Sequence, residues 1–148
     1  MKIAIGNDHG GLLYKTQLKE HLLSLGHEVI DVGTDTEDSC HYPVFAEEVA
    51  NLVSRGKVDY GVLVCTTGEG ISIAANKVKG ARCGIAYNDE VAGLMRQHND
   101  VNIIAFGQKF MSYEDCERRL DIFLNTEFEA GGRHELRVNL IKEIENRN

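Results

Sequence analysis

The sequence predicts a doubly wound α/β domain, in which helices cover both faces of a parallel β-sheet. Short runs of branched and apolar residues alternate with apolar stripes at helical spacing from one end of the chain to the other. A strand, a helix and another strand usually form a right-handed parallel crossover, so repetition of this unit builds a parallel sheet. The length of 148 residues suits one hydrophobic core, and we expect a single domain over residues 1–148.

Five strands are expected, at residues 2–6, 28–32, 60–65, 82–87 and 102–106. Three apolar stripes indicate the helices between them: Tyr14, Leu18, Leu22 and Leu25; Phe45, Val49, Leu52 and Val53; Val91, Leu94 and Met95. A further helix is predicted at residues 113–125, and a glycine pair precedes a final helix at residues 134–144. The final helix carries a stripe that can pack on its own domain or reach a second subunit: Leu136, Leu140 and Ile144.

The composition, with 43% hydrophobic and 26% charged residues, is that of an ordinary globular protein. No apolar stretch approaches the roughly 20 residues of a membrane span, and no signal-peptide pattern is present, so we expect a cytoplasmic protein. The four cysteines have no paired spacing, which predicts reduced thiols rather than a disulfide framework or a zinc knuckle. A net charge of −7 argues against general nucleic-acid binding.

Ligands of open parallel sheets bind at the carboxyl ends of the strands. Asp8 and His9 follow the first strand, in a segment flanked by glycines. They place a carboxylate and an imidazole at the mouth of the sheet. Asp8 can equally cap the following helix, and His9 can be an ordinary surface residue.

Cys65 ends the third strand and begins a glycine-punctuated turn that opens a helix. Unpaired N–H groups and the positive dipole end at a helix amino terminus stabilise an oxyanion or a nearby thiolate. A thiolate base is therefore one interpretation of Cys65. The other is a buried cysteine that serves only packing.

Three further sites have both a functional and a structural interpretation. His98 lies on the apolar side of the helix that carries Val91 and Met95, where a histidine can act in catalysis or be a satisfied core residue. Arg133 and Arg137 share a helix face and can grip one phosphate, or they can form a solvated basic surface. Tyr42 can offer a hydroxyl to a polyol or belong to a turn around the only proline.

Five segments, each a weak signal alone, together match the pattern of a known family: residues 6–11, the pair Tyr42 and Pro43, residues 68–77, residues 97–100, and residues 131–134 with Arg137. In this order and spacing the chain resembles ribose-5-phosphate isomerase type B over nearly its whole length. The same superfamily includes galactose-6-phosphate isomerase subunits and enzymes acting on allose 6-phosphate. The resemblance implies a Rossmann-like sandwich with five parallel strands, no metal and no organic cofactor. It also implies a homodimer, which can pair into a tetramer, with active sites between subunits and a C-terminal helix that reaches the partner subunit.

The resemblance also implies a role for each matching residue. Cys65 is the base that moves a proton between carbons 2 and 1, with Thr67 beside it. The loop amides stabilise the enediolate: Thr66, Thr67, Gly68, Glu69 and Gly70. The remaining residues open the furanose ring (Asp8 and His98), hold sugar hydroxyls (Tyr42 and Asn99) or hold the phosphate (His9, Lys109, Arg133 and Arg137). Both arginines come from the partner subunit.

Two positions, Thr66 and Lys109, depart from the family pattern, and Ile71 bears on the choice of base. Thr66 stands where glycine is usual, and a β-branched residue there would be strained if the backbone needed a positive φ. Lys109 replaces an arginine found in many members, which keeps the charge but loses the bidentate fork. One branch of the family uses a glutamate as the base, and this chain has Ile71 at that position, so Cys65 remains the candidate.

The expected activity is the interconversion of ribose 5-phosphate and ribulose 5-phosphate through an enediolate. Isomerisation of a hexose 6-phosphate, allose or galactose 6-phosphate, is the nearest alternative. A different alternative is a sugar-phosphate-binding subunit without turnover, in which Thr66 disables the loop. Nucleotide binding at the first turn is disfavoured, because the Gly-x-Gly-x-x-Gly spacing is absent from Gly6 onward.

Overall fold

The computed structural model describes residues 1–148 and confirms the predicted α/β class. Five parallel strands form one sheet in the order β2-β1-β3-β5-β4. The strands are β1 (Lys2–Asn7), β2 (Glu28–Asp31), β3 (Tyr60–Cys65), β4 (Cys83–Ile85) and β5 (Ile103–Gly107). The helices are the short 3-10 turn η1 (His9–Gly11), α1 (Leu12–Ser24), α2 (Tyr42–Ser54), α3 (Glu69–Ala75), α4 (Asp89–Gln97), α5 (Tyr113–Leu124) and α6 (Arg133–Asn146).

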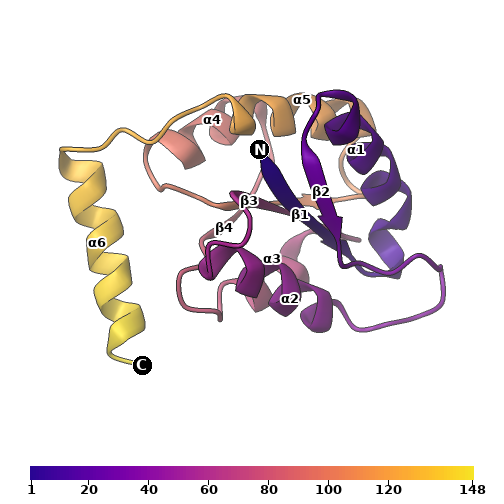
Figure 1. Cartoon of the computed structure of the whole chain (residues 1–148), viewed down its shortest axis with the longest axis horizontal. Helices are drawn as coiled ribbons and strands as arrows, with labels where there is room; N and C mark the ends of the chain where they lie inside the picture. Colours follow the sequence, from indigo (N-terminus) through magenta and orange to yellow (C-terminus); the bar gives the residue numbers. More distant parts are fainter.

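Two helical layers enclose the sheet, with α1, α4 and α5 on one face and α2 and α3 on the other (Figure 1). Successive strand residues point to opposite faces, so each strand contributes to both layers. In β1, Ile3 and Ile5 pack with Leu18 of α1, whereas Ala4 packs with Val49 of α2. The strands therefore read as continuous apolar runs, as expected for a parallel sheet buried on both faces.

The element boundaries differ from the predicted ones mainly at β4. The run predicted at residues 82–87 forms a strand only over Cys83–Ile85, because the Tyr87 N–H donates to the Ile85 carbonyl and turns the chain. In the α1 stripe, Leu18 and Leu22 are buried as expected, but Leu25 is not. Leu25 is the C-cap residue of α1 and lies beyond the face that packs on the sheet.

Helix α6 stands apart from the α/β body (Figure 1). Val138 is its only buried residue, and the stripe residues Leu136, Leu140 and Ile144 are 62%, 48% and 52% exposed. The predicted stripe therefore does not pack on its own domain.

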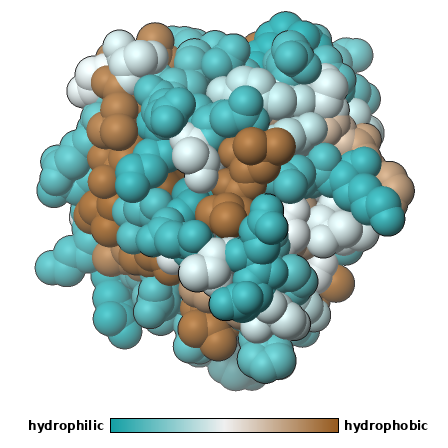
Figure 2. Space-filling view, turned by 90° about the vertical axis from the view of Figure 1, so that its right-hand side faces the viewer, coloured by the Kyte–Doolittle hydropathy of each residue, from teal (hydrophilic) through white to brown (hydrophobic).

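At the opposite end of the molecule, hydrophilic residues cover most of the surface and apolar residues form separate patches (Figure 2). None of the helices has both the length and the apolarity needed to cross a membrane.

A buried cation, Lys15, holds the segment that follows β2. Its side chain is 2% exposed, and its Nζ lies 2.9 Å from an Asp31 oxygen and 2.8 Å from an Asp35 oxygen. Burial by itself would raise the pKa of Asp31, but the hydrogen bonds from Lys15, the Gly33 N–H and Lys19 hold that pKa below its usual value. A carboxylate with a lowered folded-state pKa stabilises the protein above its unfolded pKa and loses this contribution as pH falls.

We expect Lys15→Met to lower the free energy of unfolding by about 3 kcal/mol at pH 7, because the Asp31 carboxylate then loses its buried partner. The difference between native and variant should shrink as pH falls from about 4, where the carboxylates of the unfolded chain become protonated, through the lower pKa of the folded Asp31. Urea unfolding at pH 7 and pH 3 measures both effects. Lys19→Met is the control and should cost less than about 1 kcal/mol, since Lys19 is partly exposed. An equal loss at both pH values would contradict this account of the ion pair.

Candidate functional site

The carboxyl ends of β1, β3 and β5 bring the first group of predicted residues together. Neighbouring strands are in register there, with Asn7 opposite Val64 and Cys65 opposite Gly107. The Asp8 N–H donates to the Val64 carbonyl at 3.3 Å, which joins the segment after β1 to β3. This edge therefore places Asp8 close to the segment that carries Cys65.

Cys65 lies at the bottom of a tight loop and is 5% exposed. Its Sγ accepts a hydrogen bond from the Gly68 N–H at 3.1 Å, and Thr67 Oγ1 accepts one from the Glu69 N–H at 3.1 Å. Gly68 has φ +84°, a conformation that favours glycine, so the loop can turn back over the sulfur. An N–H group aimed at the sulfur stabilises negative charge on it.

Asp8 and His9 are both fixed by hydrogen bonds. The Asp8 carboxylate is the N-cap of η1 and accepts from the Gly10 N–H at 3.0 Å, as the capping interpretation expects. His9 Nδ1 accepts from the Cys40 N–H at 3.2 Å. A neutral imidazole that accepts at Nδ1 carries its proton on Nε2. His9 therefore keeps an N–H donor that is suitable for an anionic group.

Two close approaches shape the wall around the Cys65 loop. A Cβ on Gly70 would lie 2.7 Å from the Tyr42 ring, so only glycine lets this ring rest against the loop. A Cβ on Gly10 would lie 2.2 Å from Thr66 Oγ1, so the Thr66 side chain occupies the space beside Gly10. The strain considered for Thr66 is absent, because Asp100 is the one non-glycine residue with a positive φ.

Lys109 joins this edge through its backbone. Its N–H donates to the Thr66 carbonyl at 3.1 Å, and the N–H of the preceding Gln108 donates to the Cys65 carbonyl at 2.9 Å. The Lys109 ammonium itself is 5.9 Å from the centre of the Phe110 ring. The segment after β5 thus supports the loop and carries a cation on an exposed side chain.

His98 and Asn99 lie at the opposite edge of the sheet. Helix α4 runs antiparallel to the strands, so its carboxyl end, capped by His98, returns to the amino end of β5. The next residue, Asp100, is fixed there by ion pairs with Arg96 at 2.9 Å and with Arg82 at 3.2 Å. The five residues of β5, at ~3.3 Å each, span roughly 16 Å between the two edges. A single chain therefore does not bring His98 to Cys65.

The start of α6 lies beside His98. The His98 and His134 rings stack with centroids 4.0 Å apart and planes 11° apart. Burial first, and then the neighbouring His98, lower the pKa of His134. Arg133 and Arg137 are exposed on the same helix. The second group of predicted residues thus combines His98 and Asn99 with the two arginines.

The sequence interpretation did not single out Glu129 or His134 as functional residues. The Glu129 N–H donates to the Gln97 carbonyl at 3.1 Å, which brings the segment before α6 against the end of α4. No periodic pattern marks this contact, because it depends on the path of an irregular segment. The one available signal was the concentration of histidines and arginines on either side of it.

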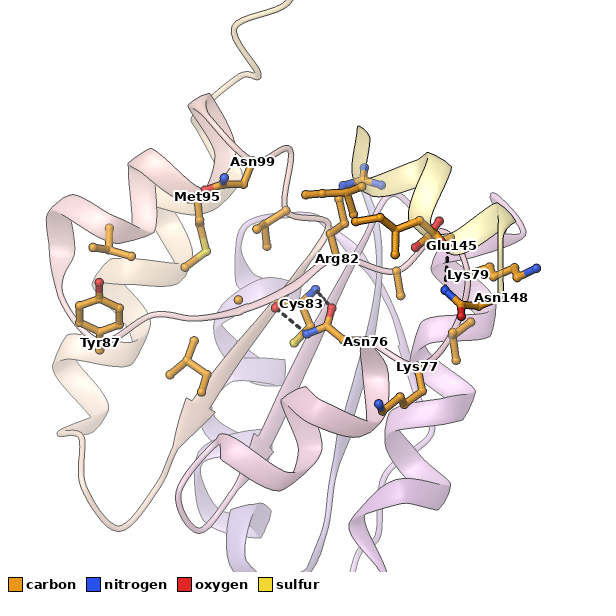
Figure 3. Close-up of a pocket in the computed structure, with 18 residues that line it drawn as sticks. Asn76, Lys77, Lys79, Arg82, Cys83, Tyr87, Met95, Asn99, Glu145 and Asn148 are labelled. Carbon is orange, nitrogen blue, oxygen red and sulfur yellow. Dashed lines mark hydrogen bonds between the residues drawn. The ribbon is translucent and has the colours of Figure 1, made fainter. Parts of the chain in front are cut away.

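A cavity of about 990 Å³ lies away from the Cys65 loop but reaches Asn99 of the second group. It runs along β4 and is bounded by α4 and α6, with Arg82, Met95 and Glu145 among its lining residues (Figure 3). Strand β4 is at the end of the sheet, and its outer edge is covered only in part. The Asn76 side chain pairs with the backbone N–H and carbonyl of Cys83. Asn99 lines this cavity, whereas Cys65 and His98 do not.

The free thiols should differ sharply in reactivity. Burial raises the pKa of Cys83 to about 12 and that of Cys116 to about 12. Since the thiolate is the nucleophile, both should react with iodoacetamide at pH 8 at least about a hundred-fold more slowly than the same cysteines in denaturant. Mass-spectrometric mapping over time measures this, with Cys40 as internal comparison; Cys40 and Cys83 are both partly exposed, whereas Cys116 is buried. Labelling of Cys116 as fast as Cys40 would contradict the expectation.

Comparison with known proteins gives one consistent result. The family described as Ribose/Galactose Isomerase matches residues 3–141. The chain is 45% identical over 146 residues to ribose-5-phosphate isomerase B of Escherichia coli, covering 99% of this chain and 97% of that one. A solved structure of the Clostridium thermocellum ribose-5-phosphate isomerase B has a TM-score of 0.97 and 45% identity, covering 99% of both chains. The Mycoplasma genitalium enzyme, solved with bound ribulose-5-phosphate, has a TM-score of 0.95 and 36% identity, covering 99% of this chain and 97% of that one.

Proposed function

The chain belongs to the ribose/galactose isomerase family, and from this premise we propose that it interconverts ribose 5-phosphate and ribulose 5-phosphate. The observation that carries the proposal is the full-length similarity to ribose-5-phosphate isomerases B, one of which was solved with ribulose-5-phosphate. The geometry around Cys65 fits this chemistry. The Thr66 side chain fills the space beside Gly10, and we infer that this favours the pentose phosphate over a hexose phosphate.

In the proposed reaction the Cys65 thiolate removes the proton from carbon 2 of the open-chain aldose. The electron pair forms the bond between carbons 1 and 2, and the charge moves to the oxygen on carbon 1. The N–H groups of Thr66 and Thr67 donate to no other group of the chain and are available to this oxygen. The thiol then returns the proton to carbon 1. The proton of the hydroxyl group on carbon 2 moves to the oxygen on carbon 1, and the carbonyl that remains at carbon 2 makes the product a ketose.

The separation of the two residue groups leads us to propose a homodimer with active sites between subunits. Each subunit would supply Cys65 and its loop from one edge of the sheet. Its partner would supply His98, Asn99, Arg133 and Arg137 from the opposite edge. This extends the resemblance-based prediction, which assigns the two arginines to the partner and gives no subunit for His98 and Asn99. A C2 dimer contains two such sites, because its two subunits contribute the same surfaces reciprocally.

The surface of the isolated chain supports a dimer. The exposed stripe on α6 and the cavity along the edge strand β4 are both apolar surfaces that a second copy can cover. Light scattering on the purified protein should give twice the chain mass. Leu140→Glu, in the exposed stripe, should shift the protein toward the monomer and lower its activity in parallel. A native monomer with full activity would contradict the dimer and leave the isomerase proposal standing.

An isotope experiment tests the enediolate chemistry. A base that exchanges its proton with solvent during the enediolate lifetime introduces deuterium at carbon 1 of ribulose 5-phosphate when the reaction runs in heavy water. Proton NMR of the sugar detects this directly. Turnover of ribose 5-phosphate without any deuterium in the product would point to direct hydrogen transfer between the carbons and would exclude Cys65 as an exchanging base.

A further inference from the structure

Two histidines and a glutamate meet where the end of α4, the segment before α6 and the first turn of α6 come together. One ligand atom from each of His98, Glu129 and His134 lies within 4.8 Å of the others. The Glu129 carboxylate is 3.8 Å from His134 Nε2, too far for a hydrogen bond. His98 makes no side-chain hydrogen bond to another residue of the chain. All three side chains therefore keep free lone pairs.

We propose that His98, Glu129 and His134 form a binding site for a divalent transition-metal ion such as Zn²⁺, and that its occupation inhibits the enzyme. Two imidazole nitrogens and one carboxylate oxygen are ligands that zinc prefers, and a substrate group or water can complete a four-coordinate site. The residues come from three segments that the fold already holds together. The inhibition rests on the proposed isomerase function, whereas the binding itself does not.

The cluster must contract slightly to hold the ion. Two ligands of one zinc ion lie at most about 4 Å apart, since each Zn–N or Zn–O bond is about 2.0–2.2 Å. The widest gap therefore has to shorten, and one of the stacked rings has to turn so that the lone pairs converge. The Glu129 side chain is 58% exposed and free to move, and the terminal torsion of histidine is broad. The hydrogen bond from the Glu129 N–H to the Gln97 carbonyl fixes the backbone, so the Glu129 carboxylate stays near the His98 and His134 rings while its side chain moves.

Inhibition follows from the ligand that the metal would occupy. His98 is the residue expected to exchange a proton with the ring oxygen of the sugar phosphate, and a metal-bound nitrogen cannot do so. The charge environment limits the affinity, because Arg133 and Arg137 lie close enough to His134 to disfavour added positive charge. We therefore expect a reversible site that a chelator empties, rather than a permanent structural metal.

Metal binding is tested without any activity measurement. The full-length protein is treated with a chelator, dialysed and titrated with Co²⁺, and Zn²⁺ is then added as competitor. We expect one ion per chain, visible bands typical of nitrogen and oxygen ligands, and displacement by Zn²⁺. Glu129→Gln should weaken binding at least about ten-fold, the lower end of what loss of a supporting group costs a metal site. Glu127→Gln, which removes an exposed carboxylate from the same segment, is the matched control and should bind like the native chain.

Binding of the metal ion to a cysteine thiol is the competing explanation, and the Co²⁺ spectrum distinguishes it from binding at the proposed site. Cys40 Sγ lies 3.7 Å from His9 Nδ1, a second place where zinc can bind. A charge-transfer band from thiolate to Co²⁺, or loss of binding in Cys40→Ser with retention in Glu129→Gln, would overturn the proposed site. Absence of binding would do the same.

The inhibitory role is tested by the ratio of isomerase activity with zinc to activity with chelator. This ratio should be about one tenth or lower for the native chain and for Glu127→Gln, and much closer to one for Glu129→Gln. Binding at the cluster without a change in this ratio would refute the inhibition alone. A chain that turns over no sugar phosphate even with chelator would instead refute the proposed function, which keeps the two failures distinct.

Discussion

Cys65→Ala is expected to lower kcat/KM for ribose 5-phosphate by at least about a hundred-fold, the smaller end of what a positioned general base contributes. The sulfur is buried at the carboxyl edge, receives an N–H at 3.1 Å and belongs to the residue directly before two unpaired loop amides. The loss should appear mainly in kcat, because the phosphate-binding groups remain in place. Steady-state kinetics on the purified variant measure it.

Cys83→Ala is the matched control for this loss. Cys83 is partly buried against the core cluster that contains Cys65, but it lies in β4, away from the loop. It should keep activity within a few-fold, and circular dichroism should show both variants folded. If Cys65→Ala kept activity within ten-fold of the native enzyme, another residue would have to be the base. Glu69 would then be the first to test, since its N–H already bonds to Thr67 in the same loop.

Two inactive variants are expected to restore activity when they share a dimer. Cys65→Ala and His98→Asn each remove a different half of the proposed site. If one subunit supplies Cys65 and its partner supplies His98, a mixed dimer contains one intact site and one with both defects. Random assembly of equal amounts should then give about a quarter of native activity, because about half of the dimers are mixed and each has one working site out of two.

The measurement is co-expression of the two variants with different affinity tags, followed by purification of the mixed dimer through both tags. The purified mixed dimer should have about half of the native kcat and the native KM. Each variant co-expressed with itself is the control and should stay inactive. An inactive mixed dimer would mean that Cys65 and His98 act from the same subunit, which contradicts the placement of His98 at the opposite edge of the sheet.

Much of the first residue group could be predicted from the sequence, because it follows from strand ends. Asp8, His9 and Cys65 come directly after apolar runs, and the carboxyl ends of parallel strands share one edge. The glycines at positions 68 and 70 were also informative. The structure shows why they are needed, one for a positive φ and the other for contact with the Tyr42 ring.

The edge of the sheet at which His98 lies could also be predicted from the sequence. In a strand–helix–strand unit the helix runs back, so a residue at its carboxyl end lies at the amino ends of the strands. The ring-opening step that we propose for His98 and Asp8 therefore needs two subunits. The stack of His98 on His134 could not be predicted, because it depends on the path of residues 125–132 between α5 and α6.

The packing partner of α6 also could not be predicted from the sequence. Its stripe predicted an apolar face correctly, but the same pattern fits packing on its own domain and packing on another subunit. The exposure of Leu136 and Leu140 in the isolated chain decides against the first of these. Similarly, Thr66 showed only that the loop departs from the usual glycine, whereas its position beside Gly10 shows which space its side chain fills.

Direct turnover tests the central claim. Ribose 5-phosphate, allose 6-phosphate and galactose 6-phosphate are assayed in parallel with the native enzyme, always with a chelator present. We predict the highest kcat/KM for ribose 5-phosphate, with ribulose 5-phosphate as the product. A higher kcat/KM for either hexose phosphate would contradict the proposed substrate while keeping the enediolate chemistry. Binding of all three sugar phosphates without any turnover would contradict the proposed isomerase activity and favour a sugar-phosphate-binding subunit.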